Sequence, residues 1–79
     1  MLVLEPGKRK QLKNRLVVLR AEKGWTQQDV AEKIGVSRQT IIAIEKNKYT
    51  PSLVLAFELA NLFGKEIHEI FQYQSSGDE

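Results

Sequence analysis

The sequence predicts an all-α domain of five short helices. Three observations point to this class: apolar residues recur at helical spacing, capping residues stand before these stretches, and glycine or asparagine follows them. The chain has 79 residues, and a domain of about this size buries only roughly 60% of the surface that its unfolded chain exposes. We therefore expect one tightly packed domain.

The first two helices are predicted from their caps and their apolar stripes. A first helix is expected over residues 14–23, capped by Asn14 and closed by Gly24. A second is expected to begin after Thr26, where an acidic residue three positions later gives a weaker version of the capping box, and to end at Gly35. The inward side chains are expected to be Leu16, Val17, Val18 and Leu19 in the first helix, and Val30, Ala31 and Ile34 in the second.

The third helix repeats this pattern. Ser37 is the expected cap, and Val36 before it is placed to pack on Ile41 as a hydrophobic staple. The helix is expected over residues 38–46, and Asn47 can end it in the left-handed conformation at modest cost.

The fourth helix, expected over residues 52–63, is the most apolar segment and should lie at the centre of the core. Its inward stripe comprises Leu53, Ala56, Leu59, Ala60 and Phe63. Gly64 ends it, and a short fifth helix is expected over residues 66–71. The apolar side chains that this helix offers to the core are Ile67, Ile70 and Phe71.

The composition excludes several classes of protein. The chain has no cysteine and one histidine, so neither a disulfide framework nor a metal site is expected. Its apolar runs are far shorter than the roughly 20 residues needed to cross a bilayer, and its first residues do not have the pattern of a signal peptide. We predict a cytoplasmic protein that uses no cofactor.

Positive charge is concentrated in the first part of the chain. Residues 1–20 contain one acidic residue, Glu5, and six basic residues: Lys8, Arg9, Lys10, Lys13, Arg15 and Arg20. Such asymmetry indicates an anionic partner, either nucleic acid or a membrane surface, and a solvated basic arm without a partner is the alternative.

Two capped helices meet at residues 34–37, which read IGVS. A short turn with glycine between two helices is the signature of a helix-turn-helix, although helical hairpins in unrelated proteins use similar corners. The stretch TQQDVAEKIGVSRQTIIAIEKNKYTPSLVLAFELANLFG resembles the lambda-repressor-like, Cro/repressor-type (xenobiotic-response-element) helix-turn-helix family. Together with IFQYQ near the end, it looks most like small stand-alone prokaryotic repressors such as the cytolysin-operon repressor.

This resemblance covers residues 14–71 and implies a compact five-helix lambda-repressor-like fold. It also implies that the terminal segments add a short antiparallel β pair near residues 12–13 and 72–73. We accordingly divide the chain into a basic N-terminal extension (1–11), a helix-turn-helix DNA-binding domain (12–74) and a disordered acidic tail (75–79).

The third helix is expected to read DNA, because the first residues of a recognition helix face base edges in the major groove. Arg can hold guanine and Gln can hold adenine through paired hydrogen bonds, and Thr can bond a base or touch a thymine methyl group. A solvated polar face without a partner is the alternative. The predicted base contacts are Arg38, Gln39, Thr40, Ile42 and Ala43.

Ile42 is the unusual member of this face. It lies one turn after Arg38, so helical geometry places it outward. An apolar side chain in the groove has the thymine methyl group as its natural partner, and we expect Ile42 to read an A·T pair. The alternative is a side chain half covered by the second helix or by the loop at Tyr49.

Phosphate contacts are expected on both sides of this face. The start of the second helix offers free N–H groups and the positive end of the helix dipole, and the resemblance implies this role for Gln27. The predicted phosphate contacts are Thr26, Gln27, Gln28, Ser37, Lys46, Asn47, Lys48 and Tyr49. The resemblance also implies a buried ion pair between Arg20 and Glu45 that locks the first helix to the third.

Two other kinds of function are considered. An enzyme is disfavoured, because His68 is expected on the exposed surface and neither a Gly-rich phosphate loop nor a grouped carboxylate pair accompanies it. A protein-interaction module, antitoxin-like or coactivator-like, would not need groove-capable residues at positions such as Arg38 and Gln39.

We therefore predict a nucleoid-associated transcription regulator that represses by binding double-stranded DNA. A chain of this size reaches one half-site, so a homodimer on a palindromic operator is expected, with half-sites about 34 Å apart. The expected dimer surface lies on the fifth helix and residues 71–74, through Ile67, Phe71 and Tyr73. No small-molecule ligand and no membrane contact are expected.

Overall fold

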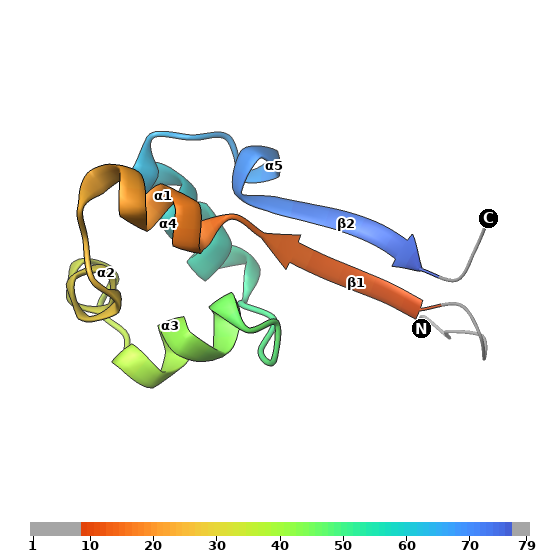
Figure 1. The fold of residues 1–79 in the computed structure, drawn as a ribbon, viewed down its shortest axis with the longest axis horizontal. Helices are drawn as coiled ribbons and strands as arrows, with labels where there is room; N and C mark the ends of the chain where they lie inside the picture. Colours follow the sequence, from red (N-terminus) through yellow and green to blue (C-terminus); the bar gives the residue numbers. More distant parts are fainter. Residues whose placement is uncertain (1–8, 77–79) are drawn as a thin grey trace.

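The computed structural model describes residues 9–76 of the chain, so residues 1–8 of the predicted extension and 77–79 of the predicted tail lie outside it. In chain order the elements are β1 (Arg9–Asn14), α1 (Leu16–Lys23), α2 (Gln27–Ile34), α3 (Arg38–Glu45), α4 (Leu53–Phe63), α5 (Ile67–Ile70) and β2 (Phe71–Ser76). The helices form one body from which the two strands project as a ribbon (Figure 1). The predicted mainly helical fold with an antiparallel pair is confirmed. In the described range, none of the helices has the length and apolar character of a membrane span.

Most helix ends follow the predicted signals. In α2 the Thr26 hydroxyl accepts from the Asp29 N–H, and the Asp29 carboxylate accepts from the Thr26 N–H, both at 2.9 Å. The capping box is therefore complete rather than weak, and the Thr26 N–H, followed by the Thr26 hydroxyl, holds the pKa of Asp29 below its usual value. Ser37 and Ser52 cap α3 and α4 through their hydroxyls. Asn47, with φ of 59°, takes the left-handed conformation after α3.

The start of α1 differs from the prediction. Asn14 is the last residue of β1, and Arg15 holds the N-cap position without a side-chain hydrogen bond. The Asn14 side-chain oxygen still accepts from the Leu16 N–H at 3.1 Å. The Arg15 N–H donates to the Ile70 carbonyl at 2.9 Å. Because this bond continues the pairing of the strands, the chain stays extended to this point and α1 begins only at Leu16.

Helix α4 contributes more residues to the hydrophobic core than any other described element, as expected for the most apolar segment. The buried apolar residues are Leu16, Leu19, Val30, Ala31, Ile41, Ile44, Leu55, Ala56, Leu59, Ala60, Phe63, Ile70 and Phe71. Trp25 packs on Phe63 at the edge of this core, with ring centroids 5.5 Å apart.

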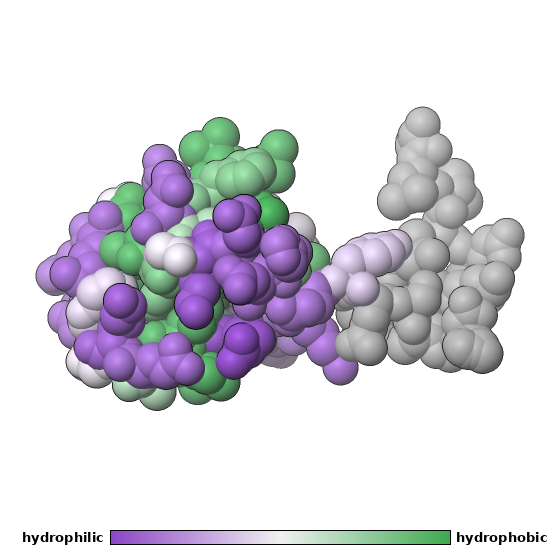
Figure 2. Space-filling view, turned by 90° about the horizontal axis from the view of Figure 1, so that it is seen from above, coloured by the Kyte–Doolittle hydropathy of each residue, from purple (hydrophilic) through white to green (hydrophobic). Residues whose placement is uncertain are grey.

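Hydrophilic side chains cover most of the surface seen in Figure 2, but hydrophobic side chains gather on one part of it.

Three residues that were predicted to be buried are exposed in the structure. Val17 and Val18 are 52% and 44% exposed, because Leu16 and Leu19 already define the buried side of α1. Leu53 is 69% exposed, because it is the first residue of α4 and lies beside an apolar hollow instead of beneath another element.

The two strands pair in antiparallel register, from Arg9 opposite Ser76 to Asn14 opposite Phe71. They are longer than predicted and extend across both expected domain boundaries, at residues 12 and 74. Because β2 begins at Phe71, α5 ends one residue earlier than expected, at Ile70.

Candidate nucleic-acid interface

The corner between α2 and α3 has the geometry of a helix-turn-helix. Gly35 has φ of 88°, a conformation that costs little only for glycine. The Val36 N–H donates to the Ala31 carbonyl at 3.0 Å, and the Val36 side chain packs partly buried against the core. These contacts direct α3 away from α2 and leave one side of α3 at the surface.

The residues of α3 divide cleanly between core and surface. Ile41 and Ile44 are 0% and 1% exposed. Arg38 and Gln39 are exposed, and their side chains make no hydrogen bond within the part of the chain that the structure describes. The other three predicted base contacts, Thr40, Ile42 and Ala43, are partly buried. The outward face therefore presents two unengaged polar side chains at the N-terminal end of α3, with smaller and apolar residues behind them.

Thr40 is held more tightly than the sequence indicates. Its hydroxyl lies 3.0 Å from the Ser37 hydroxyl, and its N–H donates to the same Ser37 oxygen at 3.2 Å. Both hydroxyls are thus engaged in capping α3. The methyl group of Thr40 is therefore the part of the side chain that is not used in capping.

The start of α2 forms one rim of this face. Gln27 is partly buried and donates from Nε2 to Oε1 of Glu45 at 3.0 Å. Gln28 is exposed and donates to Oε2 of Glu32 at 2.9 Å. Since a primary amide has two N–H donors, each glutamine keeps one for an external acceptor.

The opposite rim follows α3. The predicted phosphate contacts Lys46, Asn47, Lys48 and Tyr49 are all exposed there. The Asn47 side-chain oxygen accepts from Asn14 Nδ2 at 3.1 Å. Asn47, in the left-handed conformation, begins the turn at the C-terminal end of the outward face of α3.

Arg20 and Glu45 form the ion pair between α1 and α3. Arg20 Nε lies 2.6 Å from Glu45 Oε2, and Arg20 Nη2 lies 3.2 Å from Glu45 Oε1. The two side chains are 17% and 5% exposed. Arg20 also donates from Nη1 to the Trp25 carbonyl at 3.1 Å. Because Gln27 bonds the same carboxylate, Glu45 sets the position of α1, α3 and a predicted phosphate contact together.

Asn14 is a residue whose role the sequence does not indicate. Its Nδ2 donates to the Ile44 carbonyl at 2.9 Å as well as to Asn47. These bonds tie the end of β1 to the C-terminal end of α3, across 30 residues of sequence. A local pattern favours only a helix cap at this position, because it holds no information about so distant a partner.

The predicted dimer contacts are not all at the surface. Phe71 is only 9% exposed and belongs to the core, as predicted for the fifth helix, so little of it is left for a dimer contact. Ile67 is partly buried against the core, and Tyr73 is 65% exposed. Phe71 is the first residue of β2, directly after α5, and packs in the core before the strand leaves the helical body.

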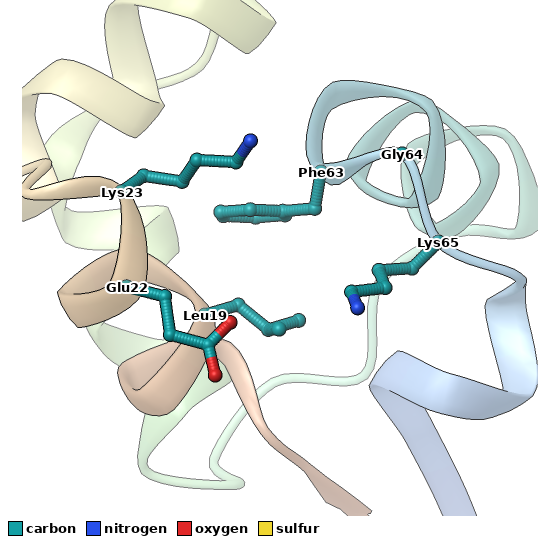
Figure 3. A pocket seen from close by; sticks show the side chains of 6 residues that line it. All are labelled: Leu19, Glu22, Lys23, Phe63, Gly64 and Lys65. Carbon is teal, nitrogen blue, oxygen red and sulfur yellow. The ribbon is translucent and has the colours of Figure 1, made fainter.

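A hollow of about 330 Å³ opens elsewhere, between the end of α1 and the end of α4 (Figure 3). Phe63 and Leu19 line it, with Lys23, Lys65 and Glu22 around them. No residue of α3 lines this hollow, so it is separate from the face described above. Within the described residues, no group of three or more His, Cys, Asp or Glu side chains is placed to hold a metal ion.

Comparison with known proteins agrees with this geometry. The helix-turn-helix family HTH_3 matches residues 18–70. An uncharacterized HTH-type transcriptional regulator of Methanocaldococcus jannaschii is 59% identical over 63 residues, which cover 80% of this chain and 96% of that protein. The crystal structure of a Bacteroides fragilis protein proposed to bind DNA has a TM-score of 0.71 at 32% identity, covering 78% of this chain and 100% of that one.

A more distant relative is the antitoxin HipB of Escherichia coli, 37% identical over 49 residues, which cover 62% of this chain and 56% of that protein. The relatives named here are regulators, DNA-binding proteins or antitoxins, not enzymes. The match to the family extends from α1 to α5 and includes the corner at Gly35 and the whole of α3. The chain therefore belongs to the Cro/C1-type helix-turn-helix family of transcription regulators.

Proposed function

We propose that this protein is a repressor that binds a palindromic DNA operator as a homodimer and reads bases with α3. The observation that carries this proposal is the outward face of α3, where Arg38 and Gln39 are exposed and unengaged at the N-terminal end of the helix. In helix-turn-helix proteins the second helix enters the major groove by this end.

The chemistry of this face suits base edges. The Arg38 guanidinium can donate two bonds to O6 and N7 of guanine, and the Gln39 amide can pair with N6 and N7 of adenine. Because the Thr40 hydroxyl is engaged by Ser37, its methyl group is the part left for a base, which suits a thymine methyl. Ala43 is small enough to let the groove floor approach.

The two rims supply the phosphate contacts in this proposal. Gln27 and Gln28 each keep an N–H donor beside the start of α2, where the helix dipole favours an anion. Lys46 and Lys48 add positive charge after α3. Such contacts position the protein and carry no sequence information of their own.

Arg38→Ala and Lys48→Ala should have different effects on DNA binding. Losing the Arg38 guanidinium should cost about 1–3 kcal/mol on the preferred operator and relax one base position. Losing the Lys48 charge should weaken all sequences alike and reduce the salt slope by about one unit for each protomer bound. Selection from random duplex DNA supplies the operator, and binding across a salt series measures both effects.

If the two variants behave alike, the assignment of α3 as the reading helix is wrong. If the selection enriches no sequence above nonspecific binding, a protein partner becomes the better reading of this domain.

Ile42→Ala tests the apolar part of the face. If Ile42 packs on a thymine methyl group, the wild type should prefer thymine to uracil at one operator position, and the variant should lose that preference. Binding to operators with single thymine-to-uracil changes measures it. An unchanged preference would make Ile42, which is partly buried in the free protein, a packing residue only.

The homodimer of this proposal needs more surface than the predicted contacts offer, since Phe71 is mostly buried. Large apolar side chains are exposed on the first half of α4: Leu53 and Val54 are each 69% exposed and Phe57 is 50% exposed. A monomeric protein rarely leaves such side chains grouped together unless they bind a partner. We place the dimer contact on this face, the α4 face, defined by Leu53, Val54 and Phe57.

The α4 face suits a second copy of the same chain in particular. Beside it lies an apolar hollow of about 290 Å³, lined by Leu12, Pro51, Leu53, Ala56, Ile67 and Phe71. In a two-fold dimer the same patch of both copies forms the interface. Such a patch must be complementary to itself, so it needs both projections and a recess that receives them. Val54 and Phe57 provide the projections and the hollow provides the recess. The predicted contact Ile67 keeps a place in this surface as part of its lining.

A further inference from the structure

The strand β1 carries positive charge that the helix-turn-helix does not use. Its Arg9, Lys10 and Lys13, with Arg15 after it, lie in a part of the chain that has no acidic residue from position 6 to position 21. The partner strand, FQYQSS, is uncharged. Lys13 and Arg15 are exposed and pair with none of the carboxylates whose side chains the structure describes. Among the described side chains, Lys13 and Arg15 therefore form a basic surface that no carboxylate neutralises.

The ribbon is attached beside the recognition helix. The Asn14 side chain donates to the Ile44 carbonyl at 2.9 Å and to the Asn47 side chain at 3.1 Å. Ile44 is in the last turn of α3 and Asn47 is in the basic rim after it. Traced away from Asn14, β1 leaves the helical body beyond the C-terminal end of α3 (Figure 1). Its partner β2 lies on the side of β1 that is farther from α3.

The exposed charge also has a defined side. Leu12 packs against the core, and neighbouring residues of a strand point to opposite faces. Lys13 is therefore on the face of the ribbon that turns away from the body. Because Leu12 packs on the body, Lys13 points to the opposite face of the strand, where a partner can reach it.

We propose that β1 is a second phosphate-binding element, which contacts the backbone of duplex DNA flanking the base pairs that α3 reads. This inference rests on the proposed function of α3. A strand of this length spans about 20 Å at roughly 3.3 Å per residue, which corresponds to about six base pairs at 3.4 Å each. An edge strand also offers backbone N–H groups, a further kind of phosphate ligand.

A different role for such charges is to protect a sheet edge from pairing with other chains. Protection needs charge on the edge but no connection to α3. The bonds from Asn14 to the end of α3, and the continuation of the charge past the strand at Arg15, favour DNA as the partner.

The test compares Lys13→Gln/Arg15→Gln with Lys33→Gln/Lys65→Gln, which removes the same charge from α2 and from the α4–α5 connection. On a selected operator with long flanks, the first variant should bind at least about tenfold more weakly. Its salt slope should be smaller by about 3.6 units, since the homodimer loses four phosphate contacts and each contributes roughly 0.9. Trimming the flanks by about six base pairs on each side should weaken binding of the wild type more than binding of this variant, which has already lost two of the charges of each ribbon. Thermal unfolding of both variants checks that they fold.

The outcomes separate this inference from the function on which it rests. If the wild type selects an operator but Lys13→Gln/Arg15→Gln binds it like the control, the inference about β1 is overturned and the function stands. If that variant aggregates while its DNA affinity is unchanged, β1 protects an edge and the inference is again overturned. If the wild type selects no operator, the proposed function itself fails.

Discussion

Glu45→Ala is expected to lower the free energy of unfolding by about 3–5 kcal/mol, the usual cost of removing one partner from a buried ion pair. The Glu45 side chain is only 5% exposed and accepts bonds from Arg20 and Gln27. Without it, the Arg20 side chain, which is 17% exposed in the wild type, has no counter-charge. Urea unfolding followed by circular dichroism measures the change, and a fall in Tm of at least about 12 °C should accompany it.

Glu58→Ala on the exposed side of α4 is the matched control. It should shift the free energy of unfolding by no more than about 0.5 kcal/mol. A double variant, Arg20→Met/Glu45→Met, separates the pair from the packing around it. It should recover much of the lost stability, because two apolar side chains leave no unpaired charge. A Glu45→Ala protein as stable as the control would show that solvent screens the pair and that it does not hold α1 to α3.

The local rules that predict this fold operate over a few residues. Thr26, Ser37 and Ser52 cap helices in the structure because a cap needs only N–H groups two or three residues ahead. The division of α3 into inward Ile41 and Ile44 and outward Arg38 follows from helical periodicity alone. These features were predictable because their partners lie within one or two turns.

The features that were not predicted depend on distant contacts. Val18 has the same apolar character as Leu19, and only the packing of the other helices decides that one is exposed and the other buried. Asn14 resembles a helix cap in sequence, yet its amide bonds the end of α3. The location of the α4 face likewise depends on which apolar residues the other elements leave uncovered: Phe71 is 9% exposed and Leu53 is 69% exposed. Periodicity identifies apolar residues and cannot tell which of them remain uncovered.

Val54→Glu/Phe57→Glu is expected to convert the protein to a monomer and to reduce its affinity for a palindromic operator by about 10²–10⁴-fold, the usual contribution of a second linked binding site. Two carboxylates on each copy would meet across the two-fold axis in a surface that excludes water, where like charges repel strongly. Sedimentation at micromolar concentration measures the oligomeric state. Titration of full palindromes and of single half-sites measures the binding.

The variant should keep its affinity for a half-site, because α3 is unchanged. Val54 and Phe57 are 69% and 50% exposed, so replacing them should not disturb the core. Val17→Glu/Val18→Glu introduces the same charges at exposed apolar positions of α1 and should leave both dimer and operator binding intact. Loss of half-site binding in the α4 variant would point to misfolding, which thermal unfolding detects. A wild type that sediments as a monomer, or an α4 variant that remains a dimer, would remove the α4 face from the interface. Because the α1 control carries equal charge, a specific loss in the α4 variant alone can be assigned to position and not to added acidity.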